Sequence, residues 1–369
     1  MAIVHERFTE YAGSERVVGE LLRVWPKADV FAPIADPSAL PPGLHPSRVR
    51  TSRLQGLYRG GKTYAHLLPL LPAAMASFDL TGYDLVVTSH HAFANRVRPS
   101  AATPLLSYTH TPARWVWEPA MRKGEAGLVG GALLAAFAST QRRPDRLAAA
   151  RVGDVLANSR AVQQRVGQWW GRESTVVPPP VDVTFYAPDP SVQREDFFLL
   201  AGRLVPYKRP EVAAAAAAAA GVRLVVVGEG RTEQAVKEAG GDAVTLLGRV
   251  SDDELRSLFR RCRAVLLPGE EDFGIIPVEA QACGAPVIAL ACGGALDTVV
   301  ADETGVLYVN QPGDPPAHAL AGVLRAFSGR DMDSRRIRRH AERFAPECFR
   351  DSVRAAAESL MARSDHEAK

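Results

Sequence analysis

Continuous apolar runs alternate with helix-compatible stretches through both halves of this chain. A strand without polar alternation is typical of a parallel sheet that helices cover on both faces. The runs expected to form strands lie at 1–4, 28–31, 85–88, 105–108 and 155–157 in the first half, and at 196–201, 223–227, 244–247, 264–267 and 286–289 in the second. The pattern predicts the α/β class, with two doubly wound, Rossmann-like domains.

Three consecutive prolines at 178–180 separate the two halves. They can continue neither a helix nor a central strand, so we place a first domain at 1–180 and a second at 181–344. The C-terminal segment, about 345–369, is compatible with a helix that packs back on the first domain. Eight consecutive alanines at 213–220 predict a helix pressed close to the second sheet, because alanine is the best helix former.

Composition excludes several classes of protein. With 369 residues, 47% of them hydrophobic and 23% charged, the chain fits a two-domain globular protein with a sizeable core. No apolar run reaches the roughly 18 residues of a membrane span, and Met1 runs directly into the first expected strand without a targeting peptide. The four cysteines lack metal-ligand spacing, which predicts reduced thiols, a cytoplasmic location and no metal site.

Charge is divided unevenly between the halves. Residues 1–180 carry 21 Lys and Arg against 13 Asp and Glu, whereas residues 181–369 carry 23 against 28. A basic first half indicates an anionic partner or surface, with a peripheral membrane contact among the choices, and a scattered solvated excess is the open alternative. Nucleic acid is not expected as a partner, because no basic stripe with interleaved aromatics is present. The fingerprints of dinucleotide-binding, P-loop and nucleophile-elbow enzymes are missing as well.

Two glutamates, Glu271 and Glu279, flank a short turn between an expected strand and an expected helix. We place Pro277 at the first helical position, where its missing N–H would be unpaired anyway. Four N–H groups would then converge at the positive end of the helix, a site that suits a diphosphate, and they belong to Phe273, Gly274, Ile275 and Ile276. A carboxylate on each side of this site predicts a phosphate-bearing ligand that is rich in hydroxyl groups.

Other strand ends in the second half add charged and glycine-containing turns. Arg203 and Lys208 follow the first strand, where a forked guanidinium and a mobile ammonium would together neutralise a diphosphate. Two more strands end at the edge where open α/β sheets bind ligands. Gly228 and Glu229 follow one of them. Arg249 and Val250 follow the other, and we expect them to meet a base. The pattern from Ser251 to Glu254 is that of a helix capping box.

The first half has a glycine loop and strand-end histidines. Gly13 and Ser14 precede the first expected helix and form a second candidate phosphate cradle. His110 ends a strand just before a proline, where a functional and a purely structural interpretation have similar weight. His90 and His91 follow another strand and are lesser candidates, since their spacing makes no recognisable metal site.

Taken in chain order, these segments resemble the family 4 retaining glycosyltransferases, which have the GT-B fold. The resemblance covers nearly the whole chain and rests on Gly13, His110, Asn158, Ser159, Gly202, Arg203, 207–209, 227–230, 247–249, Glu271 and Glu279. The segments 4–16 and 108–117 look most like a bacterial subgroup of mannosyltransferases that use GDP-mannose in surface-polysaccharide assembly. The first loop departs from the pattern, because Ser14 stands where family members often have a second glycine.

The resemblance implies roles for the candidate residues. Arg203 and Lys208 would hold the diphosphate of a nucleotide-sugar donor, and Glu279 would bind the ribose. Glu271 would contact the hydroxyl groups of the donor sugar, and His110 would support a sugar hydroxyl or position the acceptor. The implied catalytic set is therefore His110, Arg203, Lys208 and Glu271. No metal is implied, and no cofactor other than the donor substrate.

The implied reaction is the retaining transfer of a hexose, mannose in the favoured case, to a hydroxyl acceptor. In the front-face mechanism the departing phosphate oxygen takes the acceptor's proton while the basic pair stabilises the leaving group. A saccharide, a lipid-linked saccharide and a natural product stay open as acceptors. The alternatives are transfer from a UDP-sugar or another nucleotide sugar to a small natural product, a sugar-nucleotide isomerase or hydrolase, and a non-catalytic binding relative. The apolar segment 121–137, with basic flanks, is either a membrane-contacting or lipid-binding element or an ordinary helix.

Overall fold

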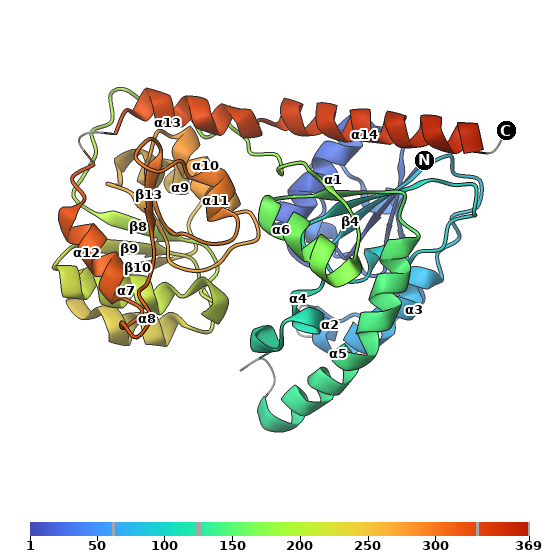
Figure 1. Ribbon diagram of the computed structural model, residues 1–369, viewed down its shortest axis with the longest axis horizontal. Helices are drawn as coiled ribbons and strands as arrows, with labels where there is room; N and C mark the ends of the chain where they lie inside the picture. Colours follow the sequence, from blue (N-terminus) through green and yellow to red (C-terminus); the bar gives the residue numbers. More distant parts are fainter. Residues whose placement is uncertain (61–62, 123–126, 330–331, 368–369) are drawn as a thin grey trace. The chain divides into compact units, whose positions relative to one another are not determined.

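The computed structural model describes residues 1–60, 63–122, 127–329 and 332–367. The chain divides into two compact units, which we treat separately (Figure 1). Unit 1 consists of Met1–Pro180 together with Glu347–Lys369, and unit 2 consists of Val181–Pro346. The sequence analysis placed its boundary at residue 180, beside the same three prolines.

Unit 1 is built on a seven-stranded parallel sheet with the strand order β3-β2-β1-β4-β5-β6-β7. Its strands are β1 (Ala2–His5), β2 (Asp29–Ala32), β3 (Val49–Thr51), β4 (Val86–His90), β5 (Leu105–Thr109), β6 (Asp154–Ala157) and β7 (Thr175–Val176). Sequence analysis missed β3 and β7. Both are edge strands of two or three residues whose side chains are partly exposed, so they lack the apolar run that marks the other five.

Helices cover both faces of the unit 1 sheet. They are α1 (Gly13–Val24), α2 (Thr63–Leu67), α3 (Leu71–Ala76), α4 (Arg114–Trp117), α5 (Gly127–Ala150), α6 (Arg160–Arg165) and α14 (Pro346–Glu367). Successive residues of β1 point to opposite faces, so Ile3 packs with α1 and α14, whereas Val4 packs with α3, α5 and α6. The two buried faces explain why these strands are apolar throughout.

The C-terminal helix α14 docks on unit 1 through one apolar stripe. Phe349, Val353 and Leu360 are buried in the cluster that also holds Tyr108 of β5. The rings of Tyr108 and Phe349 meet edge to face with their centroids 5.2 Å apart. A Cβ atom on Gly153 would lie 2.6 Å from Cδ1 of Leu360, so the Leu360 side chain occupies the space that a larger residue at this position would need.

Unit 2 is built on a six-stranded parallel sheet with the order β10-β9-β8-β11-β12-β13. Its strands are β8 (Phe198–Ala201), β9 (Leu224–Val227), β10 (Val244–Gly248), β11 (Val265–Leu267), β12 (Val287–Leu290) and β13 (Gly305–Tyr308). Only the edge strand β13 was not expected. Its helices are α7 (Pro210–Ala220), α8 (Glu233–Gly240), α9 (Asp252–Arg261), α10 (Ile275–Ala282), α11 (Ala295–Thr298), α12 (His318–Ala326) and α13 (Ser334–Ala341).

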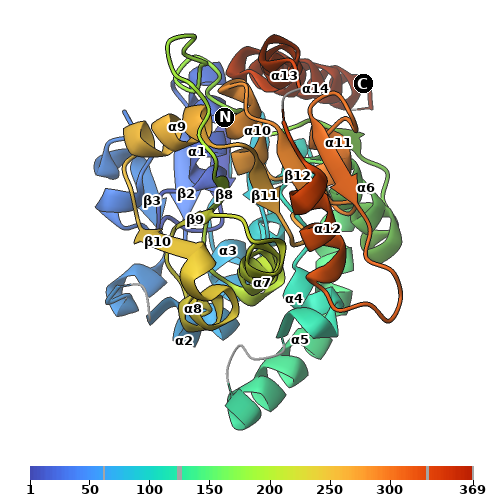
Figure 2. The same cartoon turned by 90° about the vertical axis from the view of Figure 1, so that its left-hand side faces the viewer.

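The alanine run forms helix α7, as expected. Four of its alanines, Ala213, Ala214, Ala216 and Ala217, are fully buried against β8 and β9 together with α8 and α12. Helices α9 and α10 pack on the opposite face of the same sheet (Figure 2). Alanine side chains let α7 lie close to the strands, and this prediction is confirmed.

One predicted helix start is wrong by two residues. Helix α10 begins at Ile275 after an N-cap at Gly274, so Pro277 is the third helical residue and not the first. The first four N–H groups of a helix have no partner within it, so a proline is tolerated at this position too. The consequence is that Ile275 and Ile276 supply the N–H groups of the first turn, and Pro277 supplies none.

The predicted membrane-contacting segment falls partly outside the described residues, because 123–126 are not described. From Gly127 onward it belongs to α5, in which Leu133 is 68% exposed and Phe137 stacks on Trp115. In the described part of the chain, no helix combines the length and the apolar character needed to cross a membrane.

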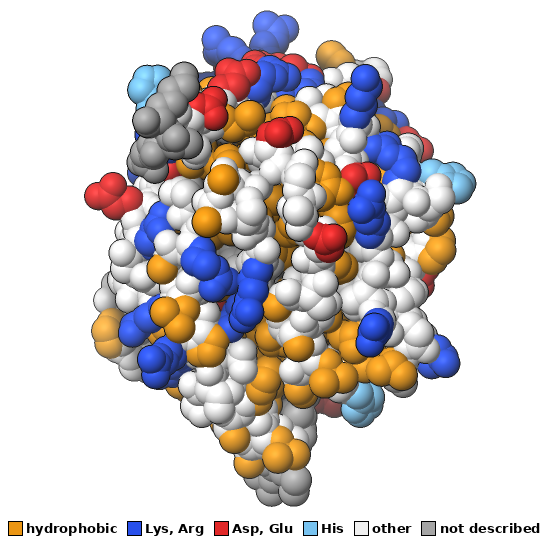
Figure 3. Space-filling view, turned by 90° about the vertical axis from the view of Figure 1, so that its right-hand side faces the viewer, with side chains coloured by type: hydrophobic (Ala, Val, Ile, Leu, Met, Phe, Trp, Pro, Cys, Tyr) orange, Lys and Arg blue, Asp and Glu red, His pale blue; other side chains and the backbone are white. Residues whose placement is uncertain are grey.

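Basic side chains on the face shown in Figure 3 stand in several separate groups among apolar and uncharged ones. The peripheral membrane contact through the basic first half stays a prediction.

Candidate functional site

The predicted donor-site residues of unit 2 lie at one edge of its sheet, where the parallel strands end. The turn with Arg203 and Lys208 follows β8, and the turn with Glu271 follows β11. In the strand order of this sheet, the chain runs outward in opposite directions from β8 and β11. Open α/β sheets bind their ligands at such a topological switch point, in the crevice at the carboxyl ends of the strands.

Lys208 and Glu271 form an ion pair across this switch point. Lys208 Nζ lies 2.7 Å from Glu271 Oε1, and the side chains are 21% and 15% exposed. Burial lowers the pKa of Lys208, but the adjacent Glu271 carboxylate outweighs burial and raises it above its ordinary value. The pair therefore presents a fixed ammonium and a fixed carboxylate, both within reach of a ligand.

Glycines let the main chains of three loops at this edge come into direct contact. A Cβ atom on Gly228 would lie 2.0 Å from the carbonyl oxygen of Gly202, and one on Gly230 would lie 2.2 Å from that of Leu204. The Gly202 N–H donates to Val227 at 3.0 Å, and the Gly228 N–H donates to the Gly248 carbonyl at 2.7 Å. The loops after β8, β9 and β10 are therefore held together by their main chains.

The ion pair lies next to the first turn of α10. A Cβ atom on Gly202 would be 3.4 Å from Lys208 Nζ and 3.1 Å from Ile276 Cδ1. Gly274, the N-cap of α10, has a φ of 90° and lies beside Glu271. The ammonium and the positive end of α10 thus act on the same space, which is a suitable arrangement for a diphosphate.

Glu279 and Arg203 differ in exposure. Glu279 is buried inside α10 with 3% of its surface exposed, and Arg203 lies on the exposed side of its turn. Arg249 is exposed after β10, whereas Val250 packs against the core. Ser251 caps α9 by accepting the N–H of Glu254 at 3.2 Å, so the N-cap half of the predicted capping box is confirmed.

A glycine pair that sequence analysis did not single out supports the turn with Glu271. Gly293 has a φ of 56°, and a Cβ atom there would lie 2.4 Å from the carbonyl oxygen of Glu271. The Gly294 N–H donates to that same carbonyl at 2.8 Å. Two adjacent glycines, separated by three residues from the expected strand at 286–289, were the available signal.

In unit 1, His110 stands just beyond β5 at the end of a buried hydrogen-bond chain. Its Nε2 lies 2.9 Å from Ser89 Oγ, and Ser89 Oγ lies 3.1 Å from His5 Nδ1. His5 Nε2 in turn lies 3.1 Å from Glu15 Oε1. Burial lowers the pKa of His110 to about 3, so the imidazole is neutral.

The first turn of α1, which holds Gly13 and Ser14, already contains an acid. Glu15 Oε2 accepts the N–H of Ala12, the N-cap, at 3.0 Å. A carboxylate in this position takes one of the N–H groups that a phosphate would use, and it repels a phosphate. The binding of phosphate by Gly13 and Ser14 stays a prediction.

The other two histidines have structural surroundings. His90 is fully buried, accepts the N–H of Asn95 at 3.2 Å and packs edge-on against Trp170. Burial lowers the pKa of His90 to about 3 and holds that of His91 well below its ordinary value. Across the described ranges, no three His, Cys, Asp or Glu side chains group as a metal site requires. That the reaction needs no metal stays a prediction.

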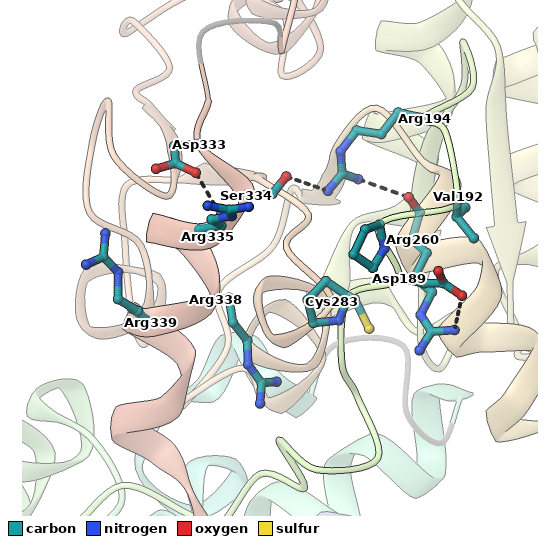
Figure 4. A pocket seen from close by; sticks show the side chains of 12 residues that line it. Asp189, Val192, Arg194, Arg260, Cys283, Asp333, Ser334, Arg335, Arg338 and Arg339 are labelled. Atoms are coloured by element: carbon teal, nitrogen blue, oxygen red, sulfur yellow. Dashed lines mark hydrogen bonds and ion pairs between the residues drawn. The ribbon is translucent and has the colours of Figure 1, made fainter.

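A cavity of about 850 Å³ in unit 2 lies away from the donor-site loops, beside α13 and the 188–194 segment (Figure 4). Main-chain carbonyl groups hold three of the five arginines that line it. Arg194 donates to Cys262 at 2.8 Å, Arg260 to Ala187 at 2.7 Å, and Arg338 to Val183 and Tyr186 at 2.6 Å each. These hydrogen bonds hold the first segment of unit 2, residues 183–194, against the rest of the unit.

Comparison with known families identifies the two halves. Residues 11–185 match the family described as "Glycosyltransferase Family 4", and residues 187–342 match the one described as "Glycosyl transferases group 1". The chain belongs to the glycosyltransferases with the GT-B fold.

Two curated relatives of this glycosyltransferase are named D-inositol 3-phosphate glycosyltransferase. The protein of Mycobacterium avium is 39% identical over 145 residues, which are 36% of this chain and 34% of that protein. The protein of Segniliparus rotundus is 31% identical over 233 residues, which are 55% of this chain and 51% of that protein. The chain thus spans about a third to a half of the length of these curated relatives.

Solved structures share the fold at low identity. HepE of Anabaena, in complex with UDP and glucose, aligns with a TM-score of 0.68 at 20% identity, covering 97% of this chain and 99% of that one. Sucrose-phosphate synthase from Thermosynechococcus elongatus aligns with a TM-score of 0.68 at 18% identity, covering 98% of this chain and all of that one. The GT-B fold expected from the sequence is confirmed.

Proposed function

We propose that this glycosyltransferase moves a hexose from a nucleotide diphosphate sugar to a hydroxyl acceptor with retention of the anomeric configuration. The observation that carries the proposal is the Lys208–Glu271 ion pair, 2.7 Å long, at the switch point of the unit 2 sheet and next to the first turn of α10. An ammonium and a helix N-terminus suit a diphosphate, and a carboxylate beside them suits sugar hydroxyl groups.

The reaction then needs no protein nucleophile. The bond between the anomeric carbon and the β-phosphate oxygen breaks, and the acceptor oxygen bonds to that carbon on the same face. The acceptor proton passes to the departing phosphate oxygen. Lys208 and Arg203 stabilise the charge that develops on the diphosphate, which is the largest contribution that the protein makes to such a step.

The other candidate residues complete the donor site in this proposal. Glu279 binds the ribose, and Gly228, Glu229, Arg249 and Val250 line the nucleotide side. Phe273, Gly274, Ile275 and Ile276 contact the sugar and phosphate. GDP-mannose is the proposed donor, and the proposed acceptor is a saccharide or lipid-linked saccharide. The resemblance of the segments 4–16 and 108–117 to mannosyltransferases supports this choice of donor.

The test is a panel of nucleotide sugars that includes GDP-mannose and UDP-glucose, with nucleotide release, glycoside formation and the shift in melting temperature as readouts. One donor should protect the protein and yield a glycoside whose anomeric configuration matches that of the donor. Release of nucleotide without any glycoside would instead point to a hydrolase. Absence of protection and turnover with every donor would refute the proposal.

Lys208 can be tested against a matched surface pair. Lys208→Ala should lower kcat about 10²- to 10³-fold, the usual loss when one preorganised charge donor is removed. Lys237 also pairs with a glutamate, at 2.8 Å from Glu233 on the exposed side of α8, and Lys237→Ala should leave turnover unchanged. Equal turnover in the Lys208→Ala variant and in the Lys237→Ala control would remove Lys208 from the mechanism.

Glu271→Gln tests the second half of the ion pair. The substitution keeps the shape of the side chain but removes the charge that Lys208 now faces. Affinity for the free nucleoside diphosphate should rise, because a carboxylate no longer offsets the positive charge of Lys208. The value of kcat should fall. Titration calorimetry with the nucleoside diphosphate measures the first effect, and steady-state kinetics the second. Weaker nucleotide binding in this variant would contradict the assignment.

A further inference from the structure

Four side chains from separate segments of unit 1 form one hydrogen-bond chain that ends at His110. Glu15 belongs to α1, His5 ends β1, Ser89 lies in β4, and His110 follows β5. Strand pairing sets His5 directly beside Ser89, because β1 and β4 are neighbours in register. The three links measure 3.1, 3.1 and 2.9 Å from Glu15 to His110.

Burial fixes the protons along this chain. His5 and Ser89 are fully buried, and Glu15 is 4% exposed. Burial raises the pKa of Glu15, but its hydrogen bonds, above all the one to His5, outweigh burial and hold the pKa below its ordinary value. Glu15 is therefore an ionised carboxylate, which can only accept hydrogen bonds.

The direction of every link follows from that carboxylate when His5 is a neutral imidazole. His5 then donates from Nε2 to Glu15, so its Nδ1 carries no proton and accepts. Ser89 then gives its one hydroxyl proton to His5 Nδ1, and its oxygen is left to accept from His110 Nε2. A neutral His110 that donates from Nε2 has no proton on Nδ1.

We propose that the Glu15–His5–Ser89 chain, with a neutral His5, is a positioning device that holds His110 in the Nε2–H tautomer, so that His110 Nδ1 accepts a hydrogen bond from a hydroxyl group of the sugar or the acceptor. The ligand's part in this inference rests on the proposed function, whereas the tautomer does not. Among the hydrogen bonds described for this chain, His110 Nδ1 takes part in none. Glu15, His5 and Ser89 do not touch the substrate in this scheme.

The neighbouring groups do not supply a competing proton. The His91 ring lies 6.2 Å from the rings of both His5 and His110, centroid to centroid. Burial, followed by the charge of Arg7, holds the pKa of His91 well below its ordinary value, so His91 is neutral. The Tyr108 ring meets His110 edge to face at 5.1 Å and offers only carbon atoms there, since its hydroxyl bonds to Val177.

Glu15→Gln should reverse the whole chain. The Ala12 N–H can only donate, so it keeps the oxygen of the introduced carboxamide, and the NH₂ group then faces His5 Nε2. His5 must accept there and donate from Nδ1 to Ser89, which turns its own hydroxyl toward His110 Nε2. His110 would consequently carry its proton on Nδ1. The side chain keeps its size, so the fold is preserved.

The readout is the tautomer of His110, measured by two-bond ¹H–¹⁵N correlation in protein labelled at its nine histidines. His110→Gln identifies the His110 signals. The unsubstituted protein should show the Nε2–H form and Glu15→Gln the Nδ1–H form, while Ser89→Ala should give a mixture. Glu20→Gln, which neutralises another glutamate of α1, should leave the spectrum of His110 unchanged. An Nδ1–H form in the unsubstituted protein, or an unchanged tautomer in Glu15→Gln, would overturn the inference.

Kinetics with fluorinated donors tests the consequence. Fluorine can accept but cannot donate, so replacing the contacted hydroxyl with fluorine should cost the unsubstituted enzyme about tenfold in kcat/KM beyond the intrinsic effect. Glu15→Gln should remove most of that penalty at one ring position of the deoxyfluoro series, since Nδ1–H can donate to fluorine. An identical hydroxyl-to-fluorine ratio in both enzymes at every position would refute the role in substrate recognition. Failure to turn over any nucleotide sugar would refute the proposed function and leave the tautomer result standing.

Discussion

Gly228→Ala should be far more damaging than an ordinary glycine substitution. The added Cβ atom would lie 2.0 Å from the carbonyl oxygen of Gly202 and 2.9 Å from the carbon of the same group. Both atoms belong to the main chain, so no side-chain rotation relieves the clash. The loop after β8 or the loop after β9 must move.

The cost has two parts that can be separated. Gly228 has a φ of 121°, a conformation that costs an L-residue about 1–2 kcal/mol. Moving either loop also strains the hydrogen bonds from Gly202 to Val227 and from Gly228 to Gly248, each of which contributes about 1 kcal/mol. The total loss in the free energy of unfolding is therefore about 3–4 kcal/mol.

Gly221→Ala provides the matched control, because Gly221 has a φ of 67° but has no neighbour within 4 Å of an added Cβ atom. It should lose only the conformational part, about 1 kcal/mol. Urea denaturation of the full chain measures both variants, and protection by the donor reports on the site. If Gly228→Ala and Gly221→Ala lost the same stability, the close packing of the two loops would not be what requires the glycine.

Three further predictions concern other parts of the chain. Gly131→Ala in α5, where an added Cβ atom meets nothing within 4 Å, should stabilise the protein by about 0.5–1 kcal/mol, measured as a rise in the denaturation midpoint. Leu360→Ala should cost about 2–4 kcal/mol because Leu360 is 6% exposed between α14 and the sheet, whereas Leu133→Ala, at a residue that is 68% exposed, should cost almost nothing. Burial, followed by the charge of Arg96, lowers the pKa of His90 to about 3. The folded state keeps this imidazole neutral while the unfolded chain protonates it below about pH 6.5, so this contribution to stability is full at higher pH and should fall by about 1.3 kcal/mol near pH 5.5. His90→Asn keeps an acceptor for the Asn95 N–H and should flatten the pH dependence of the unfolding free energy, and an unchanged slope would contradict this account.

The architecture could be predicted from the sequence because the central strands are buried on both faces. Apolar runs such as those at 85–88 and 223–227 have no other simple interpretation, and three prolines mark the boundary between the units. The strands that were missed lie at sheet edges. There, Arg50 and Thr51 are exposed, so hydrogen bonding to a neighbouring strand defines β3 without leaving an apolar pattern.

The two residues of the ion pair in the proposed donor site could be singled out from the sequence, since Lys208 and Glu271 each follow a recognisable strand. Their direct contact was not, because 63 positions separate them and only the neighbouring places of β8 and β11 in the sheet bring them together. The chain from Glu15 to His110 was missed for the same reason. His5, Glu15 and Ser89 give no signal one at a time, and their hydrogen-bond chain to His110 depends on β1, β4 and β5 being adjacent.

The two sheets place contrasting chemistry at equivalent positions. In unit 2 the charged pair at the switch point between β8 and β11 is partly exposed, so it can exchange its internal contact for contacts with a diphosphate. In unit 1 the switch point between β1 and β4 holds His5 and Ser89, which are fully buried. The hydrogen-bond chain that they form ends at His110, whose pKa is about 3. A neutral imidazole attracts a phosphate far less than an ammonium does, but it forms directional hydrogen bonds with hydroxyl groups. In the proposed reaction, the charged pair of unit 2 therefore holds the leaving diphosphate, and the neutral His110 of unit 1 recognises hydroxyl groups.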